Sequence, residues 1–328
     1  MNAYRTPEGF MDGFPEPSAP APIPGPAAQH HPDAPHAIVI GSGFGGLAAA
    51  VRLGAKGWRV TVLEKLDAPG GRAYVHRQAG HVFDAGPTII TVPYLFEELW
   101  ALCGRSFHDE VTLKALDPFY RIRFDDGSHF DYSGNLERQR AEIARIHAPD
   151  LPGYDRFVAE ADRCYQLGFE ALGDQAFDTV GDLLRASPAI LKMRGWRSLH
   201  AMVASHVKHP KLRAALSLQS LLIGGNPFSV TCIYSLINAL ERRFGVHWAL
   251  GGTGRLVQGL VSLLQGQGST LRCNAEVRRI EVEGGRATGV TLASGERIAA
   301  DIVVSNADTA WTYRHLVEPE HRHHWTDR

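Results

Sequence analysis

One glycine-rich segment constrains the fold more than any other part of this chain. It has the sequence Gly41-Ser42-Gly43-Phe44-Gly45-Gly46 and follows a short apolar run, Ala37–Ile40. A stretch with helical spacing, Leu47–Gly54, comes next, and a run rich in β-branched residues, Arg59–Leu63, then leads to Glu64. Apolar runs on either side of a helical period predict a strand, a helix and a second, parallel strand, which is the βαβ unit of α/β folds.

The glycine spacing in this unit is the G-x-G-x-x-G pattern of dinucleotide-binding turns. Gly41 allows the tight turn, Gly43 lets the backbone approach a diphosphate, and Gly46 lets the helix lie close to the strand. Free N–H groups and the dipole at the start of the helix favour an anion there. Glu64 follows Gly41 by roughly the 20 residues expected of a carboxylate that binds the adenosine ribose. These features predict a dinucleotide site and leave FAD and NAD as alternatives.

Composition limits the other classes of partner. The formal net charge is −1 at pH 7, so we expect no general attraction to nucleic acid and predict none as a partner. The four cysteines are far apart and form no C-x-x-C pair, which argues against disulfides or structural zinc and favours a reducing cytosol. His321, His323 and His324 cluster without a carboxylate or cysteine at ligand spacing, so we predict no metal site.

The chain divides into segments of different character, and its 328 residues are enough for two domains. Residues 1–35 contain nine of the nineteen prolines and almost no large apolar side chains, which predicts a disordered tail. We expect residues 36–110 and 247–310 to form one discontinuous nucleotide-binding domain, and residues 111–246 to form a mostly helical one. Residues 311–328 are short, polar and rich in histidine. We expect no secretory signal, because the chain does not begin with a basic stretch followed by an apolar core, and no membrane-spanning helix, because no apolar run of 18 residues occurs.

Strand signals recur outside the first βαβ unit. One pair, Tyr120–Phe124 and His129–Tyr132, is joined by an Asp126-Gly127 turn, which is a strong hairpin signal. Later strands are predicted at Thr270–Arg272, Val277–Val282, Ala287–Leu292, Arg297–Ile298 and Ile302–Val304. We therefore expect β/α halves on either side of a helical insertion.

Two further motifs favour FAD over NAD. Gly70-Gly71-Arg72 comes directly after the second predicted strand, and Asp84-Ala85-Gly86-Pro87 follows about a dozen residues later. With the glycine turn and Glu64, they resemble the signature of the amine-oxidase-like flavoprotein superfamily. The resemblance implies that Arg72 lies against the diphosphate and flavin side of FAD and that Val277 presents its backbone to the adenine. The cofactor-binding residues that it implies are Gly41, Gly43, Phe44, Gly45, Gly46, Glu64, Lys65, Gly71, Arg72 and Val277.

Within this superfamily the chain resembles the bacterial phytoene desaturases. The segments that carry the resemblance are Gly41–Thr88, Pro118–Arg121, Trp196–Ser198, Gly224–Phe228, Ala239–Glu241, Gly251–Gly254 and Ser305–Asp308. The implied fold is α/β, of the two-dinucleotide-binding flavoprotein type, in which a Rossmann-like FAD domain carries a mostly helical insertion that faces substrate and membrane. Family members continue well beyond this length with a further glycine-rich turn beside the flavin, and nothing after Asp308 resembles it.

The resemblance implies an FAD-dependent oxidoreductase that acts on CH–CH groups. It would desaturate phytoene toward lycopene in carotenoid biosynthesis, with a hydride passing from an allylic carbon to the flavin and a proton leaving the neighbouring carbon. The substrate would be a hydrophobic C40 precursor held in an apolar channel, for which the long helices expected over residues 183–240 are suited. The alternatives are a diapophytoene desaturase, a ketolase or isomerase of carotenoids, or a catalytically incomplete FAD-binding fragment. No oligomeric state is predicted.

The helical insertion has an uneven charge distribution. Between Asp182 and Glu241 there is no acidic residue. Seven basic residues lie in that interval: Arg185, Lys192, Arg194, Arg197, Lys208, Lys211 and Arg213. The apolar residues among them are Leu191, Met193, Trp196, Leu199, Met202 and Val203. Such a pattern predicts a basic amphipathic surface in peripheral contact with an anionic membrane, on the cytoplasmic face, with a solvated helical cap as the alternative.

Catalytic acid–base residues are only weakly indicated. Superfamily resemblance points to carboxylates near 153–163, where Asp155, Glu160 and Asp162 are available, with Glu160 and Asp162 as the candidates. An acidic position expected of bacterial members falls on Ala159 instead, and a solvated helix face is the competing interpretation. Gly252 and Thr253 are expected to bring backbone close to the flavin.

Overall fold

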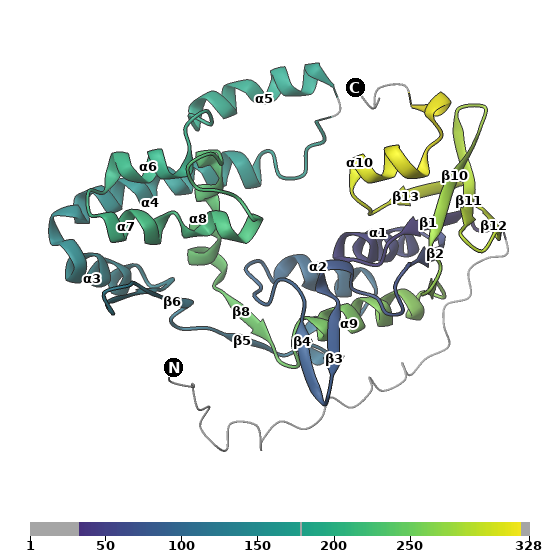
Figure 1. Cartoon of the computed structure of the whole chain (residues 1–328), viewed down its shortest axis with the longest axis horizontal. Coiled ribbons are helices and arrows are strands. Elements are labelled where there is room, and N and C mark those ends of the chain that lie inside the picture. Colours follow the sequence, from purple (N-terminus) through teal and green to yellow (C-terminus); the bar gives the residue numbers. More distant parts are fainter. Residues whose placement is uncertain (1–32, 178, 323–328) are drawn as a thin grey trace. The chain divides into compact units, whose positions relative to one another are not determined.

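The computed structural model describes residues 33–177 and 179–322, and these residues form two units (Figure 1). Unit 1 comprises residues 33–88, 97–112 and 249–322, and unit 2 comprises residues 89–96, 113–177 and 179–248. Most of the predicted tail and two of the clustered histidines, His323 and His324, lie outside the described residues. Ile89–Phe96 belongs to unit 2, unlike the predicted division, because Ile90 pairs with His247 and Tyr94 packs on Phe244.

The centre of unit 1 is a parallel sheet of four strands in the order β13-β1-β2-β9. Its strands are β1 (His36–Ile40), β2 (Arg59–Leu63), β9 (Thr270–Arg272) and β13 (Ile302–Ser305). Every residue of β1 is buried, as expected of a central strand covered on both faces. Helix α1 (Phe44–Ala55) connects β1 to β2 and packs against α9 (Thr253–Gly266). The predicted βαβ unit is confirmed, with the helix beginning three residues earlier than the periodicity indicated.

A second sheet in unit 1 is antiparallel and has three strands. It consists of β10 (Val277–Glu283), β11 (Arg286–Leu292) and β12 (Arg297–Ala299), close to the predicted bounds. Its buried face shares a hydrophobic core with Ile38 and Leu63 of the parallel sheet. Short helix α10 (Thr309–Trp311) and a π-helical turn, Thr312–Leu316, follow β13, and Leu316 is buried in the same core. Residues 312–316 are therefore a packed part of unit 1.

One hairpin of unit 1 was not predicted. Strands β3 (Val75–Gln78) and β4 (His81–Asp84) pair through the turn residues Ala79 and Gly80, both at positive φ. This hairpin carries little sequence signal because alanine is unusual at a left-handed turn position and the two exposed strands lack apolar alternation. Helix α2 (Tyr94–Leu102) comes soon after β4 in the chain.

Unit 2 begins with short strands and is otherwise helical. Strand β5 (Leu113–Ala115) pairs with β8 (His247–Ala249), and β6 (Tyr120–Arg123) pairs with β7 (His129–Tyr132) in the predicted hairpin. The helices are α3 (Leu136–His147), α4 (Leu151–Tyr165), α5 (Val180–Lys192), α6 (Leu199–His206), α7 (Pro210–Leu216) and α8 (Leu236–Phe244). The long helices expected over 183–240 are absent from the described residues, since α5 has 13 residues and α6 only 8.

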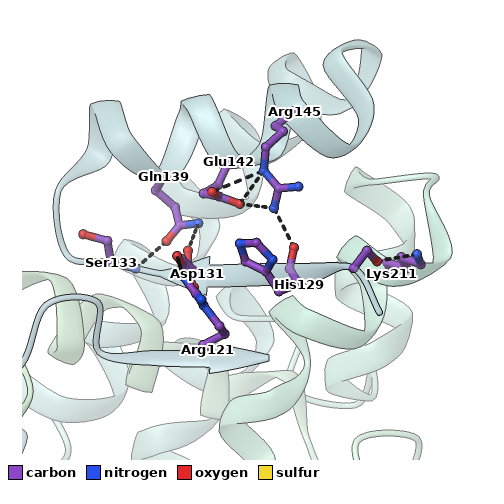
Figure 2. Close-up of polar contacts among 9 residues, drawn as sticks. Arg121, His129, Asp131, Ser133, Gln139, Glu142, Arg145 and Lys211 are labelled. Atoms are coloured by element: carbon purple, nitrogen blue, oxygen red, sulfur yellow. Dashed lines mark hydrogen bonds and ion pairs between the residues drawn. The ribbon is translucent and has the colours of Figure 1, made fainter. Parts of the chain in front are cut away.

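Polar contacts attach α3 to the β6–β7 hairpin (Figure 2). Gln139 accepts a hydrogen bond from the Ser133 backbone N–H at 2.7 Å, and Arg145 donates to the His129 carbonyl at 2.5 Å. The other face of the hairpin contributes Phe130 and Tyr132 to a core with α4 and α6. Among the described residues, no helix is long and apolar enough to span a bilayer.

Candidate cofactor site

The glycine turn leaves the start of α1 open. Gly41 has φ of +89° and donates its N–H to the Leu63 carbonyl at 2.8 Å, which holds the end of β1 beside β2. A Cβ on Gly46 would clash with the Gly41 carbonyl oxygen, so only glycine lets α1 begin this close to the strand. Gly43 is the N-cap and supplies no side-chain hydrogen bond. The start of α1 thus lacks a side-chain cap, and a helix N-terminus of this kind favours an anion.

Asn306 lies against this turn and was not predicted as a site residue. It follows β13, and its N–H donates to the Ile40 carbonyl at 2.8 Å. A Cβ on Gly45 would lie 2.5 Å from Asn306 Oδ1, and one on Gly43 would lie 3.1 Å from Nδ2. The available signal was its position shortly after the strand predicted at Ile302–Val304, because ligands bind where the carboxyl ends of parallel strands meet.

Glu64 lies at the end of β2 and is only 4% exposed. Its Oε2 accepts hydrogen bonds from the Ser42 N–H at 2.9 Å and the Ser42 hydroxyl at 2.6 Å. Its Oε1 accepts one from the Leu66 N–H at 3.0 Å. A carboxylate can accept about four hydrogen bonds, so three protein donors leave room for one more, such as a ribose hydroxyl.

The double-glycine loop closes over the same turn. The Gly70 N–H donates to the Ser42 carbonyl at 3.1 Å, and a Cβ on Gly71 would lie 3.1 Å from the Gly43 Cα. Gly70 and Gly71 both have positive φ. This contact places Arg72 beside the start of α1. The Arg72 side chain is exposed and has neither ion pair nor hydrogen bond within the described part of the chain, so its charge is free to meet an anion.

Asp84 joins the hairpin to the start of α9. Its Oδ2 accepts a hydrogen bond from the Thr253 N–H at 3.1 Å, and the Thr253 hydroxyl donates to the Pro87 carbonyl at 2.7 Å. Gly252 has φ of +80°, and a Cβ there would lie 2.5 Å from the Asp84 carboxylate. Asp84 therefore caps α9 from another segment of the chain, which fixes the backbone at Gly252 and Thr253.

The remaining predicted cofactor residues also lie in unit 1. Val277 begins β10 and is buried, and two positions earlier the Ala275 N–H donates to the Glu64 carbonyl at 2.8 Å. Phe44, the first residue of α1, is half-buried, and Lys65 is exposed directly after Glu64. The structure thus brings the turn, Glu64 and Arg72 together and places Val277 close to the chain segment that contacts Glu64.

The carboxylates considered for catalysis lie in unit 2 and are all paired with cations. Glu160 forms ion pairs with Arg197 and, at 2.6 Å, with His206 Nε2. Burial works against ionisation of Glu160, but the hydrogen bond from His206 and the charge of Arg197 hold its pKa below the usual value. Asp162 pairs with Arg242 at 2.8 Å, and Asp155 pairs with Arg140. These contacts give Glu160 and Asp162 clear structural roles.

The site in unit 1 fits FAD by its chemistry. The uncapped start of α1 and the exposed Arg72 guanidinium suit a diphosphate, and the spare acceptor of Glu64 suits a ribose hydroxyl. No group of three His, Cys, Asp or Glu residues within 33–177 and 179–322 is placed to hold a metal ion.

Comparison with known proteins agrees with this assignment. Residues 44–327 match the family described as flavin containing amine oxidoreductase. The chain therefore belongs to this family, and its cofactor is FAD.

Its sequence is also similar to curated phytoene desaturases. It is 49% identical over 295 residues to a neurosporene-forming phytoene desaturase of Cereibacter sphaeroides, covering 90% of this chain and 57% of the relative. It is 49% identical over 288 residues to a lycopene-forming phytoene desaturase of a Paracoccus species. That match covers 88% of this chain and 58% of the relative. This chain thus spans less than two thirds of the length of these relatives.

Solved structures resemble the fold at low sequence identity. A triple mutant of putrescine oxidase aligns over 87% of this chain and 60% of its own, with a TM-score of 0.62 and 16% identity. An oxidoreductase from Methanosarcina mazei aligns over 86% of this chain and 61% of its own, with a TM-score of 0.56 and 19% identity. The predicted class, an α/β flavoprotein with a helical insertion, is confirmed.

Proposed function

We propose that the protein desaturates phytoene toward lycopene in carotenoid biosynthesis and that unit 1 of this chain binds the FAD for that reaction. The observation that carries the proposal is the 49% identity to two phytoene desaturases over nearly the whole chain. When bound, FAD supplies an acceptor for the hydride that leaves an allylic carbon of the substrate. A C40 hydrocarbon has no polar group to grip, so recognition rests on apolar contacts.

In this proposal each residue of the site binds or orients the cofactor. The α1 N-terminus, with Gly43, Phe44 and Gly45, would hold the diphosphate, and Arg72 would neutralise part of its charge. Glu64 would accept a hydrogen bond from the adenosine ribose. Asp84 would hold the backbone at Gly252 and Thr253 in one position.

A second candidate is FAD binding without desaturation by this chain alone. The observation in its favour is that the chain spans only 57% of the length of its Cereibacter relative. The two candidates differ in a measurable way, because binding requires only unit 1 whereas desaturation requires substrate to be held beside the flavin.

The function can be tested in cells that accumulate phytoene. The chain is expressed alone and joined to the part of its Cereibacter relative that lies beyond the matched residues, and the pigments are read by absorption. Coloured desaturated carotenoids from the joined form alone would support the desaturase and assign this chain the FAD-binding role. Colourless phytoene from both forms, with FAD bound in each, would contradict the desaturase and leave the second candidate.

We further propose that unit 2 contacts an anionic membrane, through a surface different from the one expected. Met193, Leu199, Met202 and Val203 are buried, so they cannot touch lipid. Three of the basic side chains are paired with acids. Arg185 pairs with Asp182 of the same helix, Arg197 pairs with Glu160, and Lys211 pairs with Asp126. The basic amphipathic surface is therefore smaller than the sequence indicated.

Helix α5 provides the alternative surface. Its apolar side chains Val180, Leu183, Leu184 and Leu191 are exposed, and Trp196 shortly after it is exposed as well. Lys192 and Arg194 are exposed beside them. Apolar side chains flanked by unpaired cations are the pattern of a helix that lies in the surface of an anionic membrane, here the cytoplasmic leaflet.

Vesicle flotation tests this contact. The chain should float with vesicles that contain anionic lipid and less with purely zwitterionic ones, and the change Leu183→Glu with Leu184→Glu should abolish flotation. Leu136→Glu, at an exposed apolar position of α3, is the matched control and should float like the wild type. Equal loss in the control would contradict a role for α5.

A further inference from the structure

Unit 2 contains a buried carboxyl group that its surroundings do not compensate. Glu241, on α8, is 0% exposed. Its Oε2 accepts a hydrogen bond from the Tyr120 hydroxyl at 3.3 Å, which is long for an O–H donor. Its Oε1 makes no well-formed hydrogen bond to any described residue, and neither does Nε2 of Gln219, which lies beside it and is 2% exposed.

No cation of the packed elements is directed at this carboxyl. Tyr120 of β6 contacts it, its charge acts on Tyr132 of β7, and Arg242 and Arg243 follow it on α8. Arg242 donates to Asn238 Oδ1 at 3.1 Å and to Asp162 at 2.8 Å. Arg243 lies over the Tyr165 ring, 4.6 Å from its centroid, and within 3.5 Å of Asp162. Both guanidinium groups are thus committed to other partners.

A buried carboxylate with so few donors is unfavourable, so the neutral acid is the form that fits. Burial raises the pKa of Glu241 to about 7, and the polar side chains of Gln219 and Tyr120 offset only part of the effect. Burial, with the charge of Glu241, also raises the pKa of Tyr120, which therefore stays a neutral donor. Glu241 is therefore the group of this cluster that gains or loses a proton near neutral pH.

The segment that places Gln219 beside Glu241 is short and ends at two glycines. Gln219 belongs to a short 3-10 helix, η5 (Leu218–Ile223), which ends at Gly224 in the left-handed region. The helix is closed by its own backbone, with Gly224 N–H donating to Leu221 and Gly225 N–H to Ser220, at 3.0 and 2.9 Å. Its outer side chains are the exposed apolar Leu221, Leu222 and Ile223. Gly224 is followed by a second glycine, and a Cβ on Gly224 would meet no atom within 4 Å, so this end of η5 has space and backbone freedom to move.

We propose that Glu241 acts as a latch on η5, that is, that protonated Glu241 holds η5 closed and ionised Glu241 releases it. With the proton bound, the carboxyl is neutral and Gln219 packs over it, which holds η5 closed. When the proton leaves to solvent, the carboxylate needs water, which it reaches only if η5 moves away. Rising pH therefore opens the segment that carries Leu221, Leu222 and Ile223.

The direction of the pH effect follows from linkage. The closed state binds the proton more tightly than the open state, in which Glu241 has the ordinary value of 4.5. The closed state is most favoured below pH 4.5, loses stability as the pH rises toward 7, and changes little above. Between pH 5.5 and 7.5 the opening constant should rise about twentyfold for these two pKa values.

Hydrogen exchange of the full chain tests the latch. Protection factors of a peptide covering 218–225, corrected for the intrinsic rate, report the amides of Gly224 and Gly225. We expect protection to fall about twentyfold from pH 5.5 to 7.5 in the wild type and to stay constant in Glu241→Gln, which is neutral at every pH. Glu137→Gln, on an exposed position of α3, is the control and should follow the wild type.

Two hydrogen-exchange outcomes would overturn the proposal: the same pH dependence in Glu241→Gln as in the wild type, or a segment that is unprotected at every pH. If Glu241→Gln fails to fold, difference infrared spectroscopy of the wild type decides. A buried protonated carboxyl should give a C=O band at pH 5.5 that is weaker at pH 7.5. Absence of that band at pH 5.5 would also overturn the latch.

Discussion

The Glu64 carboxylate accepts hydrogen bonds from both the hydroxyl and the backbone N–H of Ser42, at 2.6 and 2.9 Å. The residue expected to bind ribose therefore also fixes the glycine turn that is expected to bind the diphosphate. Because Ser42 also accepts from Gly70 through its carbonyl, the double-glycine loop is held by the same residue. One residue between two glycines thus links three parts of the FAD site.

This link predicts different effects for its two side chains. Ser42→Ala removes one hydrogen bond to a charged group and should lower the free energy of unfolding by about 1.5–3 kcal/mol. The FAD dissociation constant of this variant should change by less than about threefold. Glu64→Gln places an amide donor against the donors of Ser42 and Leu66, so the FAD dissociation constant should rise about tenfold or more. Flavin fluorescence titration and urea unfolding give the two quantities. Equal FAD affinity in Glu64→Gln and wild type would contradict the ribose role.

Arg72 should matter for cofactor affinity and hardly for stability. Its side chain is exposed, so Arg72→Ala should change the unfolding free energy of the FAD-free chain by less than about 0.5 kcal/mol. Loss of a charge-assisted contact to the diphosphate should weaken FAD binding about tenfold. Arg77→Ala, on the exposed face of β3, is the matched control and should bind FAD like the wild type. If both variants bind FAD equally well, Arg72 does not meet the cofactor.

Gly46 should tolerate no side chain. In Gly46→Ala the new methyl group would clash with the Gly41 carbonyl oxygen, so strand and helix must separate at a cost of about 3 kcal/mol or more. Ala49→Gly, in the same helix, should cost only about 1 kcal/mol through helix propensity. Thermal unfolding compares the two variants. A Gly46→Ala protein as stable as Ala49→Gly would mean that the turn is looser than described.

Glu160 should behave as a structural ion-pair residue. Its pKa is lowered, so its contribution to stability is complete above pH 4.5 and is lost as the pH falls below that value. Glu160→Gln should lower the unfolding free energy by about 1–3 kcal/mol at pH 7, since Arg197 loses its charged partner and one of the two acceptor oxygens becomes an amide donor. The loss should shrink at pH 4. Loss of desaturation in the whole protein without loss of stability would restore Glu160 as a catalytic candidate.

The sequence predicted the parallel sheet of unit 1 well, because local signals determine it. The β-branched runs of β1 and β2 and the glycine turn between them admit few other structures. The β3–β4 hairpin was missed because its turn uses Ala79 at positive φ. Asn306 was missed because only the strand order places the end of β13 beside the turn.

The apolar faces of unit 2 show why burial could not be predicted. Leu199, Met202 and Val203 have helical spacing, and so do Val180, Leu183 and Leu184. The first set is buried in a core with Tyr154 and Phe157, whereas the second set is exposed. Periodicity identifies an apolar face, but contacts with distant segments decide whether that face is covered.

Asp84 provides a test of whether the backbone at Gly252 and Thr253 lies near the flavin, as expected from the sequence. Its carboxylate accepts from the Thr253 N–H and faces the positive end of the α9 dipole. Asp84→Asn keeps an acceptor and should cost about 0.3–1 kcal/mol, whereas Asp84→Ala removes it and should cost about 1–2 kcal/mol. Asp109→Ala, at an exposed position, should stay within about 0.5 kcal/mol of the wild type. Because loosening the start of α9 moves Gly252, FAD affinity should fall in the same order as stability. If the Asp84→Ala variant binds FAD as tightly as the Asp109→Ala variant, this backbone does not reach the cofactor.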